Sequence, residues 1–214
     1  ITCRDWSSDV CSSDLPPSWF DHRIDLHYHW PYNMFWLERG IFPLRYIRSD
    51  SHVLDLFCGD GFYSKYFFSQ IAIDVDALDK DIQAIEHAKK HHSSNNIYFN
   101  TFNIINDSFP KKHYDTILWF EAIEHLSKED YAIAKKKIKD VMNKDSILLG
   151  STPIVDNETK GHNNWEHENE FDSINELNDF LSSDFIVIDI FSTNHKLASG
   201  TFRNTAYFTL KNKI

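Results

Sequence analysis

The sequence predicts an α/β fold, a doubly wound and mostly parallel sheet with helices on both faces. Strand and helix patterns alternate from residue 51 to about residue 191, and a βαβα order favours parallel strands joined by helical crossovers. The first strand pattern, VLDLF at 53–57, leads directly into CGDG at 58–61. Glycines at the carboxyl end of a strand let the backbone approach a ligand closely. The 214 residues are enough for one such domain with a small extension.

The amino-terminal half of the pattern begins with a helix. Met34, Leu37, Ile41 and Leu44 recur at helical spacing, and Pro43 predicts an interruption. Alternating or continuous apolar runs then predict strands, and polar segments with helical periodicity predict helices. In order we expect a strand at 52–57, a helix at 63–70, a strand at 73–79, a helix at 82–92 capped by Asp81, and strands at 96–102 and 114–120.

The carboxy-terminal half continues the alternation. A helix is expected at 128–142 and a strand at 146–152, which Pro153 should stop. Ser173 and Glu176 have the spacing of a capping box, so a helix with an apolar stripe is expected at 174–181. Two last strands are expected at 185–191 and 204–211.

Three segments organise the chain. Residues 1–15 contain DWSSDVCSSDL, which has no apolar period and resembles the translation of a sequencing adapter, so we expect a non-native leader without fixed structure. Residues 16–50 are expected to form a helical cap, and residues 51–214 the main domain.

Composition excludes several functional classes. A formal net charge of -10 argues against a protein that holds a long track of nucleic-acid phosphates. No apolar run approaches the length of a membrane span, so neither nucleic acid nor a membrane is an expected partner. Cys3, Cys11 and Cys58 have neither a disulfide nor a metal-site spacing, which suits a reducing cytoplasm.

The glycine turn allows two ligands. A pyrophosphate, as in dinucleotide oxidoreductases, prefers free N–H groups and a positive helix end, and the carboxylates Asp55 and Asp60 disfavour it. S-adenosylmethionine carries an ammonium group and a sulfonium, which carboxylates favour. Asp79 follows Gly61 by 18 residues, close to the spacing at which an acid holds ribose hydroxyls. Both ligands have such a ribose, so the charge pattern decides for the methyl donor.

Over residues 51–191 the chain resembles the class I S-adenosylmethionine-dependent methyltransferases, whose fold is a Rossmann-like seven-stranded sheet. VLDLFCGDG resembles the family's first motif, ALDKD its ribose-binding acid, and YDTILWFEAIEHL the fourth motif of the small-molecule subgroup of ubiquinone-type and sugar O-methyltransferases. LLGSTP and HENEF resemble the next two signatures. The cofactor-binding residues that the resemblance implies are Asp55, Gly59, Asp60, Gly61, Asp79, Lys80, Asn103, Ile104, Phe120 and Glu121.

One residue departs from the family pattern. Phe57 replaces the first glycine, and the resulting DLFCG string also occurs in cytosine-DNA methyltransferases. Those enzymes need a Pro-Cys nucleophile loop, and related RNA enzymes need an Asn-Pro-Pro or Asp-Pro-Pro turn after the fourth strand. Here that position is WFEAIEHL, so we reject a nucleobase acceptor.

A hydroxyl acceptor needs a base to remove its proton. His167 is the first candidate, because the neighbouring Glu166 and Glu168 would raise its pKa and orient it. An exposed histidine in an acidic loop is the alternative. Glu124 and His125 follow the fourth strand and are the second candidates, although Glu124 also suits a helix start.

A metal site is not expected. Asp25, His27 and His29 make a possible metal corner, but one such triplet is more often an ordinary polar turn. Tyr28, Trp30 and Trp36 suit either an apolar acceptor wall or packing of the helix on the sheet.

The expected function is O-methylation of a sugar, glycan precursor or secondary metabolite. The alternatives are a non-catalytic module that keeps the nucleotide fold, and a nicotinamide-dependent reductase, which Asp60 and the missing third glycine disfavour. The acceptor itself and the oligomeric state have no signal in the sequence.

Overall fold

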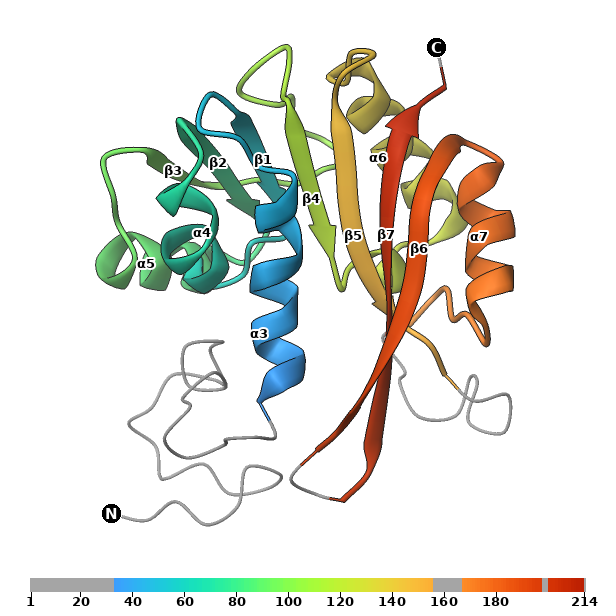
Figure 1. Cartoon of the computed structure of the whole chain (residues 1–214). Coiled ribbons are helices and arrows are strands. Elements are labelled where there is room, and N and C mark those ends of the chain that lie inside the picture. The colour runs from blue at the N-terminus through green and yellow to red at the C-terminus, as the bar shows by residue number, and fades with distance from the viewer. Residues whose placement is uncertain (1–32, 156–166, 198–199, 214) are drawn as a thin grey trace.

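The computed structural model describes residues 33–155, 167–197 and 200–213. These residues contain a seven-stranded sheet with the order β3-β2-β1-β4-β5-β7-β6 (Figure 1). The strands are β1 (His52–Leu56), β2 (Asp74–Asp79), β3 (Ile97–Thr101), β4 (Thr116–Phe120), β5 (Ile147–Pro153), β6 (Phe185–Lys196) and β7 (Phe202–Asn212). The helices are α3 (Met34–Ile41), α4 (Phe62–Tyr66), α5 (Ile82–His91), α6 (Lys128–Asp140) and α7 (Ile174–Ser182), with 3-10 helices η1 (Phe42–Arg45), η2 (Phe68–Gln70) and η3 (Ile123–His125).

The predicted doubly wound sheet is confirmed. Strands β1 to β5 pair in parallel, and β7 is inserted antiparallel between β5 and β6. The strand order reverses between β1, which leads outward to β2 and β3, and β4, which leads outward to β5. In open α/β sheets ligands bind beyond the carboxyl ends of the strands at such a reversal. The loops after β1, β2 and β4 therefore locate the candidate site.

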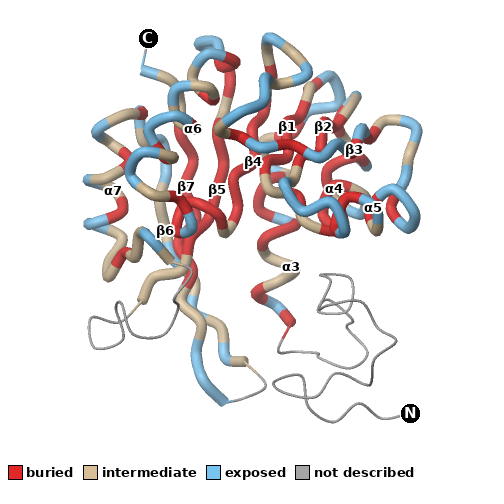
Figure 2. The backbone as a smooth tube through the Cα atoms, turned by 180° about the vertical axis from the view of Figure 1, so that it is seen from behind, coloured by how far each residue is buried: buried red, intermediate tan, exposed pale blue. Residues whose placement is uncertain are grey.

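Helices cover both faces of the sheet. Figure 1 shows α3, α4 and α5 on the near face, and Figure 2, from behind, shows α6 and α7 on the other. Each face has its own apolar core. The larger core packs residues such as Trp119, Tyr131 and Leu177 under α6 and α7, and the second packs residues such as Phe42, Val75 and Phe120 under the near-face helices. The central strands are buried along their length, as Figure 2 shows.

Most element boundaries agree with the expectations to within a few residues, and two differ. The helix expected at 63–70 is divided into α4 and η2, with Phe67 between them at φ -120° and ψ -65°. The last two strands are much longer than predicted and pair as an antiparallel hairpin, with a register shift between Val187 and Asp189. Its tip carries polar residues such as Asn194 and Asn204, which pair directly and have no apolar alternation to mark them as strand.

The acidic residues of β2 correct one expectation. The alternation in residues 73–79 predicts an exposed acidic face, but Asp76 is 3% exposed. Its Oδ2 accepts a hydrogen bond from the hydroxyl of Tyr114 at 2.7 Å. The same oxygen forms an ion pair with Nζ of Lys111 at 2.5 Å. A central parallel strand is covered on both faces, so a carboxylate there needs partners from other elements.

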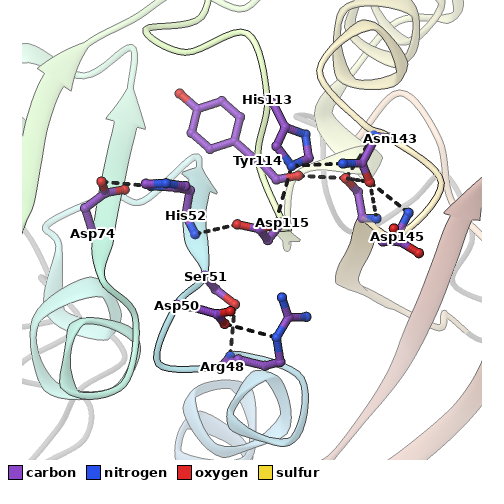
Figure 3. A network of polar contacts seen from close by, with 11 residues as sticks. Arg48, Asp50, Ser51, His52, Asp74, His113, Tyr114, Asp115, Asn143 and Asp145 are labelled. Atoms are coloured by element: carbon purple, nitrogen blue, oxygen red, sulfur yellow. Dashed lines mark hydrogen bonds and ion pairs between the residues drawn. The ribbon is translucent and has the colours of Figure 1, made fainter.

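Polar contacts fasten the amino ends of the strands, opposite the candidate site. The amide of His52 donates to Oδ2 of Asp115 at 2.8 Å, and its ring Nδ1 lies 2.9 Å from Oδ2 of Asp74, which joins β1 to the start of β2 (Figure 3). The hydroxyl of Ser146 donates to the carbonyl of Tyr114 at 2.7 Å. These contacts set the strand starts in register at the edge that carries no expected function.

The cap segment packs against the sheet through α3. Arg39, 6% exposed, donates to the carbonyl of Phe120 at 3.3 Å, and Glu38 accepts Thr193 at 2.7 Å and His195 at 2.8 Å from β6. Figure 1 shows that α3 and the β6–β7 hairpin both extend past the carboxyl ends of the central strands. The division of the chain at residues 15 and 50 stays a prediction, because residues 1–32 lie outside the described part. In the described residues, no helix has the length and apolar character to cross a membrane.

Candidate active site

The backbone after β1 makes a tight turn through the two glycines. Phe57, Gly59 and Gly61 all have positive φ, at 60°, 57° and 76°. The amide of Cys58 donates to the carbonyl of Leu78 at 3.0 Å, which ties the turn to the end of β2. Phe57 stands in the left-handed region that costs a side chain about 1–2 kcal/mol. The family's glycine would avoid that cost at this position, and Phe57 instead packs against the core.

Gly61 is required by packing as well as by backbone conformation. A Cβ at this position would lie 2.4 Å from Cε1 of Phe99 and 2.9 Å from Cβ of Ala88. The turn that starts α4 therefore lies directly against α5 and β3. Cys58, buried beside this turn, behaves as the small packing residue expected from the sequence. Burial raises the pKa of its thiol well above the usual value, which argues against a thiolate nucleophile.

Asp79 and Gly59 face each other. The amide of Gly59 donates to Oδ2 of Asp79 at 2.8 Å, and the amide of Asp81 donates to Oδ1 at 2.9 Å. The glycine turn and the candidate ribose acid thus belong to one site. A carboxylate has about four acceptor positions, so these two bonds leave room for ligand hydroxyls. Burial raises the pKa of Asp79 above its ordinary value, and the two backbone bonds oppose that shift.

The other two acids of the first motif lie deeper. Asp55 is 5% exposed, and Oδ2 accepts the hydroxyl of Ser64 at 2.5 Å. Burial raises its pKa to about 7, against the opposing effects of Ser64 and of the Arg39 charge. Asp60 is 1% exposed, and its Oδ1 accepts the amide of Phe62, the first residue of α4, at 3.0 Å. Both acids thus hydrogen-bond to residues of α4, directly after the turn.

The remaining predicted cofactor residues lie in the loops after β2, β3 and β4. Lys80 is exposed beside Asp79. Asn103 is exposed, and its Oδ1 accepts the amide of Ile105 at 2.9 Å, which shapes the loop in which Ile104 is buried. Phe120 is buried at the end of β4, with its ring beside that of Phe42. All lie at the carboxyl edge, and their contact with a cofactor stays a prediction.

Glu121 directly follows β4 with a positive φ of 48°. Its Oε1 accepts the hydroxyl of Ser151 at 2.7 Å, and Oε2 forms an ion pair with Arg203 from β7. The Arg203 guanidinium also lies over the ring of Phe35, 4.4 Å from its centroid. One arginine therefore connects the loop after β4, the hairpin and α3.

Glu124, His125 and His167, which the sequence predicts as two separate sets of catalytic candidates, lie close together. Each offers a ligand-type atom, a carboxylate oxygen or a ring nitrogen, and these atoms all lie within 4.8 Å of one another. The rings of His125 and His167 are 5.0 Å apart at their centroids. Glu124 is 2% exposed, and its Oε2 accepts the hydroxyl of Thr152 at 3.1 Å. Burial, with the charge of Glu121 as a second cause, raises the pKa of Glu124 to about 8.

The environment of His167 differs from the one expected. Its Nδ1 lies 3.2 Å from Oε1 of Glu170, and its side chain is 7% exposed. Burial and the neighbouring His125 lower the pKa of His167, and Glu170 does not outweigh them. The expectation that Glu166 and Glu168 raise the pKa was therefore wrong. Glu168 is exposed, and its backbone amide donates to the carbonyl of Glu124 at 2.7 Å. Glu166 lies outside the described residues.

Sequence reasoning missed three residues of this region. Arg203 is an ordinary charged residue in the sequence, and its importance comes from pairing across the fold with Glu121, 82 residues away. Thr152 and Glu170 lie within LLGSTP and HENEF, but neither string indicates which of its side chains contacts Glu124 or His167. The possible metal corner at Asp25, His27 and His29, together with Tyr28 and Trp30, lies outside the described residues. Trp36 is described and half-buried, with its ring against Phe35.

The sheet order defines a doubly wound, Rossmann-like fold, and the glycine turn after β1 is hydrogen-bonded to Asp79 at the end of β2. Residues 53–145 match a family model described as a methyltransferase domain. Similar solved structures include the N-methyltransferase NodS from Bradyrhizobium japonicum, with a TM-score of 0.68, 15% identity and coverage of 85% of this chain and 98% of that one. An S-adenosylmethionine-dependent methyltransferase from Methanosarcina mazei has a TM-score of 0.63, 16% identity and coverage of 81% and 98%.

A third structure is DhpI, solved as a complex with SAH, with a TM-score of 0.61, 18% identity and coverage of 90% of this chain and 93% of that one. At these identities the likeness establishes the fold. The family match over residues 53–145 and the shared fold together support a class I S-adenosylmethionine-dependent methyltransferase. Among curated proteins, no match to this sequence was found.

Proposed function

We propose that this protein transfers the methyl group of S-adenosylmethionine to a hydroxyl oxygen of a small molecule, such as a sugar, a glycan precursor or a secondary metabolite. The observation that carries the proposal is the group Glu124, His125 and His167, whose polar atoms lie within 4.8 Å of one another after β4. A hydroxyl must lose its proton to become a methyl acceptor, and this group offers the chemistry for it.

The cofactor half of the site rests on the glycine turn and the end of β2. S-adenosylmethionine supplies an electrophilic methyl group on a sulfonium, so the protein's task is to bind, orient and exclude water. Gly59 and Gly61 bring the backbone close, and Asp79 offers its remaining acceptor positions to ribose hydroxyls. The loop containing Asn103 and Ile104 would hold the adenine, and Phe120 and Glu121 would border the methyl group.

The acceptor half rests on the loop after β4 and the segment from residue 167. Because burial and His125 lower the pKa of His167, the imidazole is neutral at neutral pH and can accept a proton. The absence of a Pro-Cys or Asn-Pro-Pro loop, and the net charge of -10, favour a small acceptor over a nucleobase. Cysteine usage favours a reducing cytoplasm as the place of reaction.

Methyl transfer from labelled S-adenosylmethionine tests the proposal. The acceptor panel should contain sugars, glycan precursors and hydroxylated metabolites, each beside an amine of the same skeleton. We expect label on the hydroxyl compounds. Label on amines alone would contradict an oxygen acceptor. The amines are included because NodS, which has a similar fold, is an N-methyltransferase. Cofactor binding without transfer to either set would favour the non-catalytic module.

His167→Ala tests the acceptor half separately. If His167 acts on the acceptor's proton, turnover should fall roughly 10²-fold or more, with cofactor affinity unchanged. His113→Ala is a matched control, because His113 also lies beside a carboxylate, 3.4 Å from Asp115, but at the opposite edge of the sheet. Equal turnover in both variants would assign the role to another residue.

A further inference from the structure

The group Glu124, His125 and His167 has the ligand set of a metal site. Two imidazoles and one carboxylate are contributed by two segments that are separate in the sequence. We infer that these three side chains bind one divalent transition-metal ion, and that the ion holds the acceptor hydroxyl. This inference rests on the proposed function and adds a cofactor that the sequence did not predict.

The spacing of the three ligand atoms suits a single ion. Metal bonds of about 2.0–2.2 Å to nitrogen or oxygen place the ligand atoms of one ion about 3–4 Å apart. The atoms here lie within 4.8 Å of one another. Side-chain movement of an ångström or less therefore completes the coordination. No other group of three such residues meets this criterion in the described part of the chain.

Backbone contacts hold the two segments together without help from a metal. The carbonyl of Glu124 accepts the amides of Glu168 at 2.7 Å and Asn169 at 3.0 Å. The side chain of Asn169 also donates to the carbonyl of Leu126. The segment from residue 167 is thereby fastened to η3, which directly follows β4. A prearranged ligand set is what a bound ion requires, because ordering ligands at binding would cost conformational entropy.

The ligands have outer partners of the kind that metal sites use. Metal-binding histidines commonly donate their second ring nitrogen to a carboxylate, which fixes the tautomer and the ring orientation. Glu170 lies 3.2 Å from Nδ1 of His167 and suits this role, with Nε2 directed to the ion. Thr152 orients the carboxylate of Glu124 at 3.1 Å. Glu170 is in this account a positioning residue.

The ligand types select the class of metal. Imidazole favours zinc, iron, nickel, cobalt and copper, whereas magnesium and calcium prefer oxygen ligands. Three protein ligands leave coordination positions open, as in catalytic sites. The expected occupant is therefore a transition-metal ion with an open position for an oxygen of the acceptor.

The ion changes how the acceptor loses its proton. Coordination lowers the pKa of a bound hydroxyl as it does for metal-bound water. The O–H bond breaks, the proton passes to solvent water, and the electron pair stays on oxygen. That pair forms the bond to the methyl carbon, and the electrons of the broken C–S bond return to sulfur, so the sulfonium becomes a neutral thioether. In this account His167 is a ligand and the ion replaces it as the proton-removing agent.

Titration with Co²⁺ tests the site without any methyl acceptor. The full chain without an affinity tag, freed of metal with a chelator, is titrated while visible d–d absorption and heat are recorded. We expect one tightly bound ion per chain. His125→Ala, His167→Ala and Glu124→Gln should each weaken the affinity by more than about 100-fold, and Glu170→Gln by about 10–100-fold. Glu170→Asp, which can keep a carboxylate on the ring, should recover part of that loss.

His87→Ala is the matched control for adventitious histidine binding. His87 and His91 lie one turn apart on α5, which follows β2, with ring centroids 4.6 Å apart, and neither belongs to the proposed ligand group. This variant should keep the high-affinity spectrum unchanged. No Co²⁺ binding in the wild type, or binding that survives both His125→Ala and His167→Ala, would overturn the inference. His125 is exposed, so its variant remains informative where His167→Ala fails to fold.

Binding of S-adenosylmethionine, measured by calorimetry on the same metal-free samples, separates this inference from the proposed function. Cofactor binding without Co²⁺ binding would overturn the metal site and leave the methyltransferase proposal standing. Co²⁺ binding that depends on the three ligands, without cofactor binding, would support the metal site and overturn the proposed function.

Discussion

Gly61 shows how a single residue joins backbone conformation to packing. Its φ is 76°, and a Cβ would meet Phe99 at 2.4 Å. Gly61→Ala should therefore lower the free energy of unfolding by about 2–5 kcal/mol, the sum of left-handed strain and overpacking. Denaturant unfolding measures the change.

Gly200→Ala separates the two causes. Gly200 also has a left-handed φ, 88°, but a Cβ there meets nothing within 4 Å. This control should cost about 1–2 kcal/mol, from strain alone. Equal losses in both variants would show that the contact with Phe99 contributes nothing.

Asp55 predicts a pH dependence of stability. Burial raises its pKa to about 7 in the folded protein, against 3.8 for the free group. Between these two values the folded state binds more protons than the unfolded state, so stability falls as pH rises through this window. From pH 5 to pH 8 the loss from this group should be about 2–3 kcal/mol.

Asp55→Asn isolates that contribution. Asparagine can still accept the hydroxyl of Ser64 but carries no charge at any pH. The difference in unfolding free energy between the variant and the wild type should therefore grow in the variant's favour from pH 5 to pH 8. A pH-independent difference would show that Asp55 is ionised throughout.

Residues differ in whether a local sequence pattern predicts their place in the structure. Gly59, Gly61 and Asp79 could be predicted because turn chemistry and a fixed spacing act locally along the chain. Asp76 was expected to be exposed and is buried, because its partners Lys111 and Tyr114 come from a distant loop. Long-range pairing of this kind leaves no local pattern.

At the scale of elements, the start of α5 carries a testable cap. Oδ1 of Asp81 accepts the amides of Gln83 at 2.8 Å and Ala84 at 3.3 Å. Asp81→Ala should lower the free energy of unfolding by about 1 kcal/mol, because two helix-end amides lose their acceptor. Asp81→Ser keeps a capping oxygen and should remain close to the wild type. A loss as large in Asp81→Ser as in Asp81→Ala would contradict the cap.

Element types were predictable where periodicity and caps agree. The hydroxyl of Ser173 accepts the amide of Glu176 at 3.2 Å, as the capping box predicts. The Glu176 carboxylate, however, accepts the backbone amide of Asp172 instead of the amide of Ser173. The hairpin of β6 and β7 was too short in the prediction, because its distal residues, apart from Phe202, are mostly polar and show no apolar alternation. On β6, Thr193 and His195 also contact Glu38 of α3, a long-range contact that no local pattern indicates.

At the scale of the whole molecule, the strand order explains why distant motifs meet. Carboxyl ends of β1, β2 and β4 lie at one edge of the sheet (Figure 1), where the glycine turn follows β1, Asp79 ends β2 and Glu121 follows β4. The alternating pattern predicted this edge. The metal-type ligand set was not predictable, because His125 and His167 are 42 residues apart and only the fold brings them together.

We propose that the glycine turn and Asp79 form one binding site for S-adenosylmethionine. Calorimetric titration of the full chain with this ligand tests it most directly, with Asp79→Ala as the variant and Asp189→Ala, on the exposed face of β6, as the control. We predict binding by the wild type and the control, and an affinity lower by about 1–3 kcal/mol in Asp79→Ala, the scale for a lost hydrogen-bond partner. Equal affinity in all three proteins, or no binding by the wild type, would contradict the account.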